Sequence, residues 1–554
     1  MKRQKILVLI FVVFITNVLL AQPGNNKVII QGKFTPSISD AQKILSVPVL
    51  KDTVYQVPSF KYDIEEKILE TPFKVSPIKP AKLFGEPLTK LYPNYVALGM
   101  GNYLTPYFEF YHSKLRSRDT KYGVHLKHFS SAGTINDYAF PAWSNNFAEV
   151  YGSKFWKKSI LDANVSYKRD VTHFYGFQPV DFPDSLLPND ADNVQRYNLV
   201  NADLHWYRYR LRTKDMNYDL KGNYYFLNDF FNNSENHIGM VASLDWNIDL
   251  VKSFSSQRLG FDLTEDFYHN KWDTLAMQNA NLLKVTPYYS FITDALSVKV
   301  GLSIQTKTDS MSTLFFYPEL KINLAAIPNI LYFNLNMTGG QTRNSLKSFS
   351  DENPFIISQI PLQFTNTKFQ INFGLGSSIS KSVNFDLQLY YDRVENAPLF
   401  ISDTNEFYLN KFTVLYEDYD RIKLQADITY QLHEKLRFLL RGNYYIYNMS
   451  SDFPWHKPSY DVSLTANYNI QDKIILRAAI LTYGAAKVPK WEQGVLVPQT
   501  LKGWVDFNLG VEYRYRKKLG FFVNFNNIGA ARYYKWYDYP SYKFNFLAGL
   551  SYIF

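Results

Sequence analysis

Apolar and polar side chains alternate one for one along many stretches of the chain after Asn94. In the segment WVDFNLGVEYRYR, residues 504–516, one face carries Val505, Phe507, Leu509, Val511, Tyr513 and Tyr515. Its other face carries Asp506, Asn508, Gly510, Glu512, Arg514 and Arg516. Segments 161–168, 296–307, 423–432 and 460–470 repeat the pattern. Successive side chains of a β-strand point to opposite faces of a sheet, so each segment predicts a strand with one apolar and one polar face.

The number and length of these strands decide between two all-β folds. We place about 22 strands between Asn94 and Phe554, many of them roughly 11 to 15 residues long. Strands of soluble proteins have about five or six residues, whereas a tilted strand needs about ten to cross a bilayer. A β-sandwich explains any single alternating strand, but the whole set predicts an all-β, transmembrane, antiparallel, up-and-down β-barrel.

The segments between the predicted strands are short and long in turn. Short ones lie near Lys157, Asp294, Pro328, Lys381, His433, Gln471 and Lys517. Long ones span residues 132–144, 173–195, 341–361, 449–458 and 486–500. Outer-membrane barrels combine tight periplasmic turns with longer extracellular loops. We therefore expect short periplasmic turns, long extracellular loops and a periplasmic N-terminal segment.

The segment YKFNFLAGLSYIF, residues 542–554, carries an apolar residue at every second position. An uncovered edge strand with such a face is a liability in water, so we expect this face to meet lipid and a first strand near residues 95–100 to close the edge. A terminal aromatic strand of this type is similar to the signal read by outer-membrane assembly machinery. We assign that signal to Tyr542, Phe544, Phe546, Leu550, Tyr552 and Phe554.

Composition places the chain outside the class of helical membrane proteins. It has 43 Tyr, 43 Phe, no Cys and 20% charged residues, and its mean hydropathy is −0.25. Residues 1–21 have a basic start, an apolar run and a small residue at Ala21, which predicts a signal peptide. No later stretch is apolar enough for a transmembrane helix. The exported chain is therefore expected in the cell outer membrane, surrounded by its lipids.

The net charge does not indicate nucleic-acid binding. The formal charge is +10, and without Lys2, Arg3 and Lys5 of the leader it is about +7, spread along the chain. Residues 22–93 are rich in proline and lack a sustained period, which predicts an extended periplasmic or lumenal arm. The predicted organisation is therefore a signal peptide at 1–21, an arm at 22–93 and a barrel at 94–554.

Two long stretches resemble the barrels of TonB-dependent receptors. LYEDYDRIKLQADITYQLHEKLRFLLRGNYYIYN, residues 415–448, is similar to a late hairpin of that family, and FFVNFNNIGAARYYKWYDYPSYKFNFLAGLSYIF, residues 521–554, to its final hairpin. The resemblance implies a wide outer-membrane barrel. Members of the family carry a globular plug before the barrel, whereas residues 22–93 are too few and too rich in proline for one. The string DTVYQVP looks somewhat like the family's coupling box, at Asp52, Thr53 and Val54.

No pattern in the chain indicates catalysis, a cofactor or a metal site. The nine His are scattered, and His125 and His128 point to opposite faces of one predicted strand. The chain has no GxSxG, HExxH or Walker-type motif, so we expect no enzymatic activity. The acidic segment 181–192 suits either a surface calcium site or a solvated outer loop. The latter is the plainer interpretation.

Two functions remain open from the sequence. The predicted inward face carries both signs of charge, as at Lys168, Lys299, Asp427 and Glu512, which is typical of a wet lumen. The first function is a plugless pore or conduit for solutes. The second is a non-transporting barrel subunit or scaffold of a larger outer-membrane complex, with the arm docking a periplasmic or lipoprotein partner.

Overall fold

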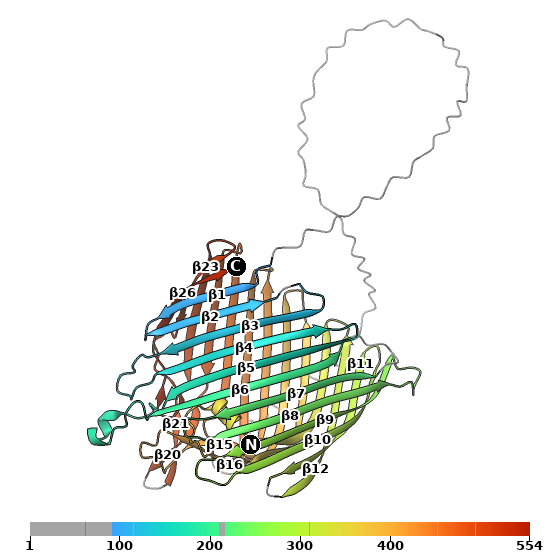
Figure 1. The fold of residues 1–554 in the computed structure, drawn as a ribbon. Helices are drawn as coiled ribbons and strands as arrows, with labels where there is room; N and C mark the ends of the chain where they lie inside the picture. The colour runs from blue at the N-terminus through green and yellow to red at the C-terminus, as the bar shows by residue number, and fades with distance from the viewer. Residues whose placement is uncertain are drawn as a thin grey trace, which may run out of the picture. The chain divides into compact units, whose positions relative to one another are not determined.

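The computed structural model describes residue 61 and residues 91–114, 116–209, 216–309, 311–450, 453–492 and 495–554. The predicted leader, nearly all of the predicted arm and the Asp52–Val54 segment lie outside these residues. The part from residue 91 onward folds as a barrel of long, tilted strands (Figure 1).

The wall of the barrel is one closed sheet of 22 strands. Its first eleven strands are β1 (Asn94–Gly101), β2 (Thr105–Ser113), β3 (Thr120–Ser131), β4 (Trp143–Phe155), β5 (Ser159–His173), β6 (Val194–Arg208), β7 (Asn217–Asn228), β8 (Ser234–Asn247), β9 (Ser256–Lys271), β10 (Gln278–Ile292) and β11 (Leu296–Thr308). The others are β12 (Ser312–Ile327), β13 (Leu331–Arg343), β14 (Phe364–Ser378), β15 (Val383–Ser402), β16 (Phe412–Leu432), β17 (Leu436–Met449), β18 (Tyr460–Ile470), β19 (Ile474–Tyr483), β22 (Trp504–Arg514), β23 (Leu519–Asn526) and β26 (Asn545–Ile553).

Every wall strand pairs antiparallel with its neighbours along the chain, and the ring closes between β1 and β26. At this seam Tyr95 lies opposite Ile553 and Gly99 opposite Gly549. A Cβ atom on Gly549 would clash with the Leu98 carbonyl oxygen, so the close approach of the two strands requires glycine there. The predicted closed barrel of about 22 strands, sealed by a first strand near residues 95–100, is confirmed.

The connections differ between the two ends of the barrel. At one end, the turn end, they are short, as at 156–158, 293–295, 433–435 and 471–473. At the other, the loop end, they include the long segments 174–193, 344–363, 484–503 and 527–544. Two loop-end connections, 102–104 and 309–311, are as short as the turns, and the turn-end connection 248–255 is longer than the loop-end connection 229–233. The predicted alternation is therefore correct for most strands but not all.

The long loops contain small elements of their own. Residues 174–193 include the 3₁₀ turns η1 (Pro179–Asp181) and η2 (Asp184–Leu186), and residues 344–363 include helix α2 (Leu346–Glu352). The segment 486–500, predicted as a loop, is a separate hairpin of β20 (Ala486–Glu492) and β21 (Val495–Leu501). The last loop carries the short pair β24 (Tyr534–Trp536) and β25 (Tyr539–Pro540).

The outside of the wall is apolar and the inside is polar. Along β22, Val505, Phe507 and Tyr513 are exposed on the outside, whereas Asp506 on the inner face is only 6% exposed. Large apolar side chains are exposed on the outside all round the barrel, as at Val150, Leu204 and Leu389. Burying this surface in hydrocarbon removes it from water, which identifies the barrel as a membrane structure.

The final strand presents Phe546, Leu550 and Tyr552 on the outside, each about two-fifths exposed. Tyr542 precedes the strand and does not share this face, because its ring lies 4.6 Å from that of Tyr103 and its hydroxyl donates to the Pro141 carbonyl oxygen at 3.2 Å. In the described part of the chain, no α-helix has the length and apolar character needed to cross a membrane.

Candidate functional site

The inner wall is lined by charged side chains that pair across neighbouring strands. Lys299 lies 2.7 Å from Asp262 and 3.1 Å from Glu319, and Arg421 lies 2.5 Å from the buried Asp392. Each of these five charges thus has a partner of opposite sign inside the barrel. Such pairs lower the cost of holding ions away from bulk water.

The remaining residues predicted to point inward also find partners. Asp427 accepts from Arg441 at 2.6 Å, and Asp506 accepts from the Tyr533 hydroxyl at 2.8 Å. Lys423 lies over the ring of Tyr390, and Arg516 lies in a turn over the ring of Tyr515. The residues named here form no ring of like charge around the lumen.

The loop end is covered by a hydrophobic cluster that we call the cap. It is built from loops 174–193, 344–363 and 527–544 together with the strand ends beneath them. Its fully buried side chains include Phe174, Leu346, Phe349, Ile356, Phe400 and Phe412. Trp536 and Tyr539 of the last loop pack against this set, with Tyr539 stacked on Phe355 at a centroid distance of 3.7 Å. The loops therefore fold inward on one another and do not project freely.

Hydrogen bonds tie the cap across the barrel. The Asn410 side chain, between β15 and β16, donates to the Phe174 carbonyl oxygen, between β5 and β6, at 2.6 Å. The Tyr539 hydroxyl donates to the Asn410 carbonyl oxygen, and the Tyr175 hydroxyl donates to that of Pro540 at 3.0 Å. Loops that arise on opposite walls thus hold each other in place.

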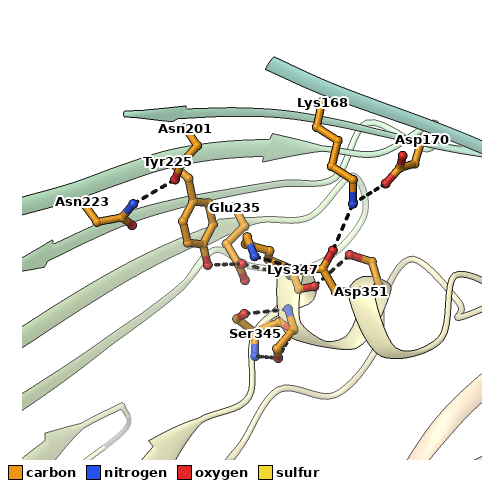
Figure 2. A network of polar contacts seen from close by, with 11 residues as sticks. Lys168, Asp170, Asn201, Asn223, Tyr225, Glu235, Ser345, Lys347 and Asp351 are labelled. Atoms are coloured by element: carbon orange, nitrogen blue, oxygen red, sulfur yellow. Dashed lines mark hydrogen bonds and ion pairs between the residues drawn. The ribbon is translucent and has the colours of Figure 1, made fainter. Parts of the chain in front are cut away.

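Helix α2 is fixed to the wall by Glu235 of β8 (Figure 2). The Glu235 carboxylate is fully buried and accepts from the backbone amides of Leu346 and Lys347 at 2.8 and 3.2 Å. It also accepts from Tyr225 and Asn270 at 2.8 and 2.7 Å. A carboxylate at a helix N-terminus satisfies amides that lack intrahelical partners, and here it attaches the helix to the sheet.

The hairpin β20–β21 is joined to the cap through the loop between β17 and β18. The His456 amide donates to the Lys487 carbonyl oxygen at 2.8 Å, and the His456 Nδ1 donates to that of Phe400 at 2.9 Å. Burial lowers the pKa of His456 to about 4, so its imidazole is neutral at pH 7. Its Nε2 has no hydrogen-bond partner among the described residues, as expected for the unprotonated nitrogen of a neutral ring.

The last loop carries a second group with a shifted pKa. Burial raises the pKa of Asp538 to about 6. Asp538 lines a small cavity of about 190 Å³ together with Phe177, Tyr408 and Trp491. Phe177 and Tyr408 are stacked there at a centroid distance of 4.6 Å, although they belong to different loops.

Three cavities follow one sector of the wall from the cap to the turn end. The first, of about 330 Å³, lies under the cap and is lined by Asp461, Tyr483 and Trp504. The second, of about 700 Å³, is lined by Thr465, Arg477, Asn508 and Glu512, among others. The third, of about 1050 Å³, is lined at the turn end by Gln471, Lys473 and Arg514, among others. All three therefore lie along β18, β19 and β22.

A charged cluster separates the second cavity from the third. Glu512 accepts from Arg477 at 2.8 Å and from Arg514 at 3.1 Å, so one carboxylate lies between two guanidinium groups. Glu512 lines both cavities, together with Tyr95 and Ser551 of the seam. A solute moving along this sector passes the cluster.

The residues weighed for catalysis or metal binding are not brought together. His125 lies 3.1 Å from Glu109 inside the barrel, while His128 contacts Asn146 on the other face of the strand. Asp181, Asp184 and Asp192 form no metal-binding group, and no set of three His, Asp or Glu among the described residues has that geometry. The candidate site is therefore the cap and the row of cavities beneath it.

The sequence analysis missed the cap, although two signals for it are present. Ser345 and Ser348 form a reciprocal capping box at the start of α2, which a Ser-x-x-Ser pair only weakly suggests. Loop 174–193 contains the run FYGF, whose aromatic density is high for a solvated loop. Which loops pack together depends on contacts between segments hundreds of residues apart, and no local pattern encodes them.

No protein-family model and no curated protein matches the sequence. Solved structures match the fold. An iron transporter from Neisseria meningitidis, FrpB, aligns over 84% of this chain and 82% of its own, with a TM-score of 0.64 and 9% identity. The siderophore receptor PirA from Acinetobacter baumannii aligns over 83% and 80%, with a TM-score of 0.61 and 10% identity.

A third structure, the ferric-catecholate import receptor Fiu from E. coli K12, aligns over 84% of this chain and 82% of its own, with a TM-score of 0.60 and 10% identity. Identities this low show the fold alone. The barrel has the architecture of TonB-dependent siderophore receptors, which confirms the resemblance found in the sequence at the level of the fold.

Proposed function

We propose that this chain forms an outer-membrane conduit for solutes whose extracellular mouth is gated by the cap. The proposal is supported by the shared fold with an iron transporter and an import receptor, and by the polar wall beneath the cap. Under it the loop end faces the outside of the cell and the turn end faces the periplasm. A solute enters where the cap opens and leaves at the turn end.

The row of three cavities along β18, β19 and β22 carries this proposal. Three spaces that follow one another along the same strands offer a solute a continuous candidate route from the cap to the turn end. The lining residues Asp461, Asn508 and Glu512 are polar, so water and polar solutes can occupy the spaces. The cap must move for passage, and the undisturbed barrel should therefore conduct little.

The cap also favours a second function. A barrel that serves as a non-transporting subunit or scaffold, docking a periplasmic or lipoprotein partner, needs no open mouth. The buried side chains of the cap and the fixed helix α2 fit that role as well. The two functions differ in whether the lumen conducts once the cap is removed.

Single-channel recording in planar bilayers separates them. A variant with residues 345–362 replaced by a Gly-Ser linker removes α2 and much of the cap. We expect discrete conductance steps from this uncapped barrel and few from the parent. In the uncapped background, Arg477→Ala should raise conductance because it removes one side of the charged cluster. Arg441→Ala is the matched control, since Arg441 also pairs with an inward carboxylate but lines none of the three cavities.

An uncapped barrel that folds, as judged by heat-modifiable mobility on gels, and yet does not conduct would exclude the conduit. A partner that co-purifies in mild detergent would then support the scaffold.

The proposal includes export through the leader, residues 1–21, and insertion by the outer-membrane assembly machinery. It also includes the absence of a plug formed by residues 22–93. Deleting residues 25–88 from the uncapped barrel tests the last point. If these residues filled the lumen as a plug, their removal would open it and raise the conductance. Larger conductance after deletion would assign these residues to the lumen. Unchanged conductance would leave them, with Asp52–Val54, to a partner in the periplasm.

A further inference from the structure

Positive charge is concentrated on one arc of the turn end. Three turns that are neighbours in the wall, 515–518, 114–119 and 156–158, carry three, three and two Lys or Arg residues and a single side-chain carboxylate, Asp119. The six other turns described in full, 248–255, 293–295, 328–330, 379–382, 433–435 and 471–473, carry four cations and four carboxylates. We call the three basic turns the basic crescent.

The crescent lies beside aromatic side chains of the outer wall. Tyr122 and Tyr513 at strand ends, Trp156 in a turn of the crescent and Tyr552 of the neighbouring β26 are exposed close to the turn end. Tyr and Trp of membrane barrels gather at the level of the lipid headgroups. These rings therefore mark where the headgroups of this leaflet meet the wall.

Two cations of the crescent lie over rings at this level. The Lys114 Nζ is 5.5 Å from the ring centroid of Tyr122, and the Arg516 guanidinium is 5.3 Å from that of Tyr515. Lys157 follows the exposed Trp156 directly in the chain. Long basic side chains extend along apolar surface while their charged ends stay in the polar headgroup layer. The crescent is thus at the lipid boundary.

We propose that the basic crescent binds anionic phospholipid headgroups of the leaflet at the turn end. The inference rests on the proposed membrane insertion, but not on conduction through the lumen. Each cation near an anionic membrane surface attracts headgroup phosphates over about a Debye length. The crescent has an excess of cations, whereas cations and carboxylates are equal in number on the six other turns counted above. The barrel should therefore gather anionic lipid beside the crescent.

The alternative occupant is an acidic segment of a periplasmic protein. Arg516, Lys517 and Lys518 also line the cavity of about 1050 Å³ at the turn end, which such a segment could enter. The turns 114–119 and 156–158 do not line that cavity. Because most of the crescent borders the wall and not the mouth, the observations favour lipid.

The test compares two variants of equal charge. The crescent variant carries Lys114→Glu, Arg118→Glu and Lys157→Glu, none of which lines the cavity at the turn end. The control carries Lys252→Glu, Lys381→Glu and Lys435→Glu, on turns that are not next to the crescent in the wall. Each full-length barrel is reconstituted in vesicles of phosphatidylethanolamine and phosphatidylglycerol and extracted with a polymer that retains adjacent lipid. Mass spectrometry then measures the enrichment of phosphatidylglycerol in the discs over the vesicles.

We expect phosphatidylglycerol to be enriched in the discs of the parent and of the control. In the discs of the crescent variant its enrichment should be about tenfold lower. High salt should reduce the enrichment of the parent, since the Debye length falls to about 3 Å at 1 M. If the crescent variant fails to fold, Gln at the same three positions should give a smaller loss. Equal enrichment in both charge-reversed variants would overturn the lipid assignment and favour an acidic protein. An equal loss of enrichment in both variants would also overturn the assignment, because it would show that the net charge of the barrel, and not the crescent, attracts the lipid.

Discussion

Asn410 and Phe174 lie in loops from opposite walls of the barrel, and the Asn410 side chain donates to the Phe174 carbonyl oxygen at 2.6 Å. Asn410 is only 2% exposed. The Phe174 oxygen also accepts from Asn193 at 3.0 Å. One buried amide thus connects two segments that are 236 residues apart, which makes the cap a single packed unit and not a set of independent loops.

Removing this bridge should loosen the cap without unfolding the barrel. Asn410→Ala deletes one hydrogen bond, worth about 1 kcal/mol, while Asn193 keeps the Phe174 oxygen satisfied. We expect faster amide hydrogen exchange in residues 174–177 and unchanged exchange in the wall strands. Asn189→Ala, on the exposed part of the same loop, is the control and should change neither. Equal exchange in the two variants would contradict the bridging role of Asn410.

Glu235→Gln should release α2 from the wall. The carboxylate accepts from two helix amides, and an amide side chain can satisfy only one of them without turning a donor toward the other. We expect a local loss of about 2 kcal/mol, read as faster hydrogen exchange in residues 345–352. Asp351→Asn, which removes the exposed pairs with Lys347 and Lys168, should cost well under 1 kcal/mol. A larger effect from Asp351→Asn would reverse this ranking.

Acid should open the loop around His456. The pKa of His456 is about 4 in the cap and about 6.5 when exposed, so the displaced loop binds more protons between these values. The stability of the packed loop is therefore complete above pH 6.5 and falls as the pH drops toward 4. Limited proteolysis at about pH 7.5 and about pH 5 should show greater cleavage in acid.

Asp538 has the opposite dependence, because its raised pKa favours the packed loop in acid and the benefit is lost as the pH rises through 6. The comparison is therefore made in an Asp538→Asn background. There His456→Asn, which keeps an amide donor for the Phe400 oxygen, should remove the remaining pH dependence. Persistence of that dependence would assign it to another group.

The two faces of β26 should respond differently to a charge. Tyr552→Asp places a carboxylate on the lipid side, at a cost between about 0 and 3 kcal/mol depending on depth, whereas Ser551 faces the cavities inside. We propose that the predicted residues other than Tyr542 also form the assembly signal, namely Phe544, Phe546, Leu550, Tyr552 and Phe554. Tyr552→Asp should then lower the yield of folded barrel on heat-modifiable gels, and Ser551→Asp should not. Equal yields would contradict both the outward face and the signal.

The proposed orientation can be tested with epitope tags on whole cells. A tag inserted at Asn189, in an exposed segment of the loop end, should bind antibody on intact cells. A tag at His433, in the turn between β16 and β17, should bind only after the outer membrane is permeabilised. The reverse result would mean that the turn end faces outward.

The wall could be predicted from the sequence because its two faces meet different solvents. Alternation in segments such as 161–168 and 504–516 records lipid on one side and water on the other, residue by residue, and the strands follow it. The short turns near Lys157, Asp294 and Gln471 were located for the same reason, since each interrupts the alternation. Closure of the ring followed from the need to cover both edges.

The cap could not be predicted in the same way. Tyr542 continues the alternation of β26 into the loop, yet its ring packs on Tyr103, because contacts with distant loops override the local pattern there. The hairpin β20–β21 was predicted as a loop, and it has prolines at 489 and 498. The two prolines lie opposite each other in a two-stranded pair that leaves their outer edges unpaired, where proline is tolerated in a strand. Both cases depend on long-range packing.

The seam between β1 and β26 has a consequence for the time course of folding. All other neighbours in the wall are close in sequence, so hairpins can form as soon as their strands are available, but Tyr95 must wait for Ile553. Until then β1 is an open edge able to pair with any other strand. The entropic cost of bringing two distant chain ends together grows only slowly with chain length. Closure of the ring is therefore delayed mainly because β26 is the last strand to form, and less because β1 and β26 must find each other. Pairing of β26 with β1 is therefore the step that completes the barrel. Any change that slows this pairing prolongs the time during which the open edges can pair with a strand of another chain.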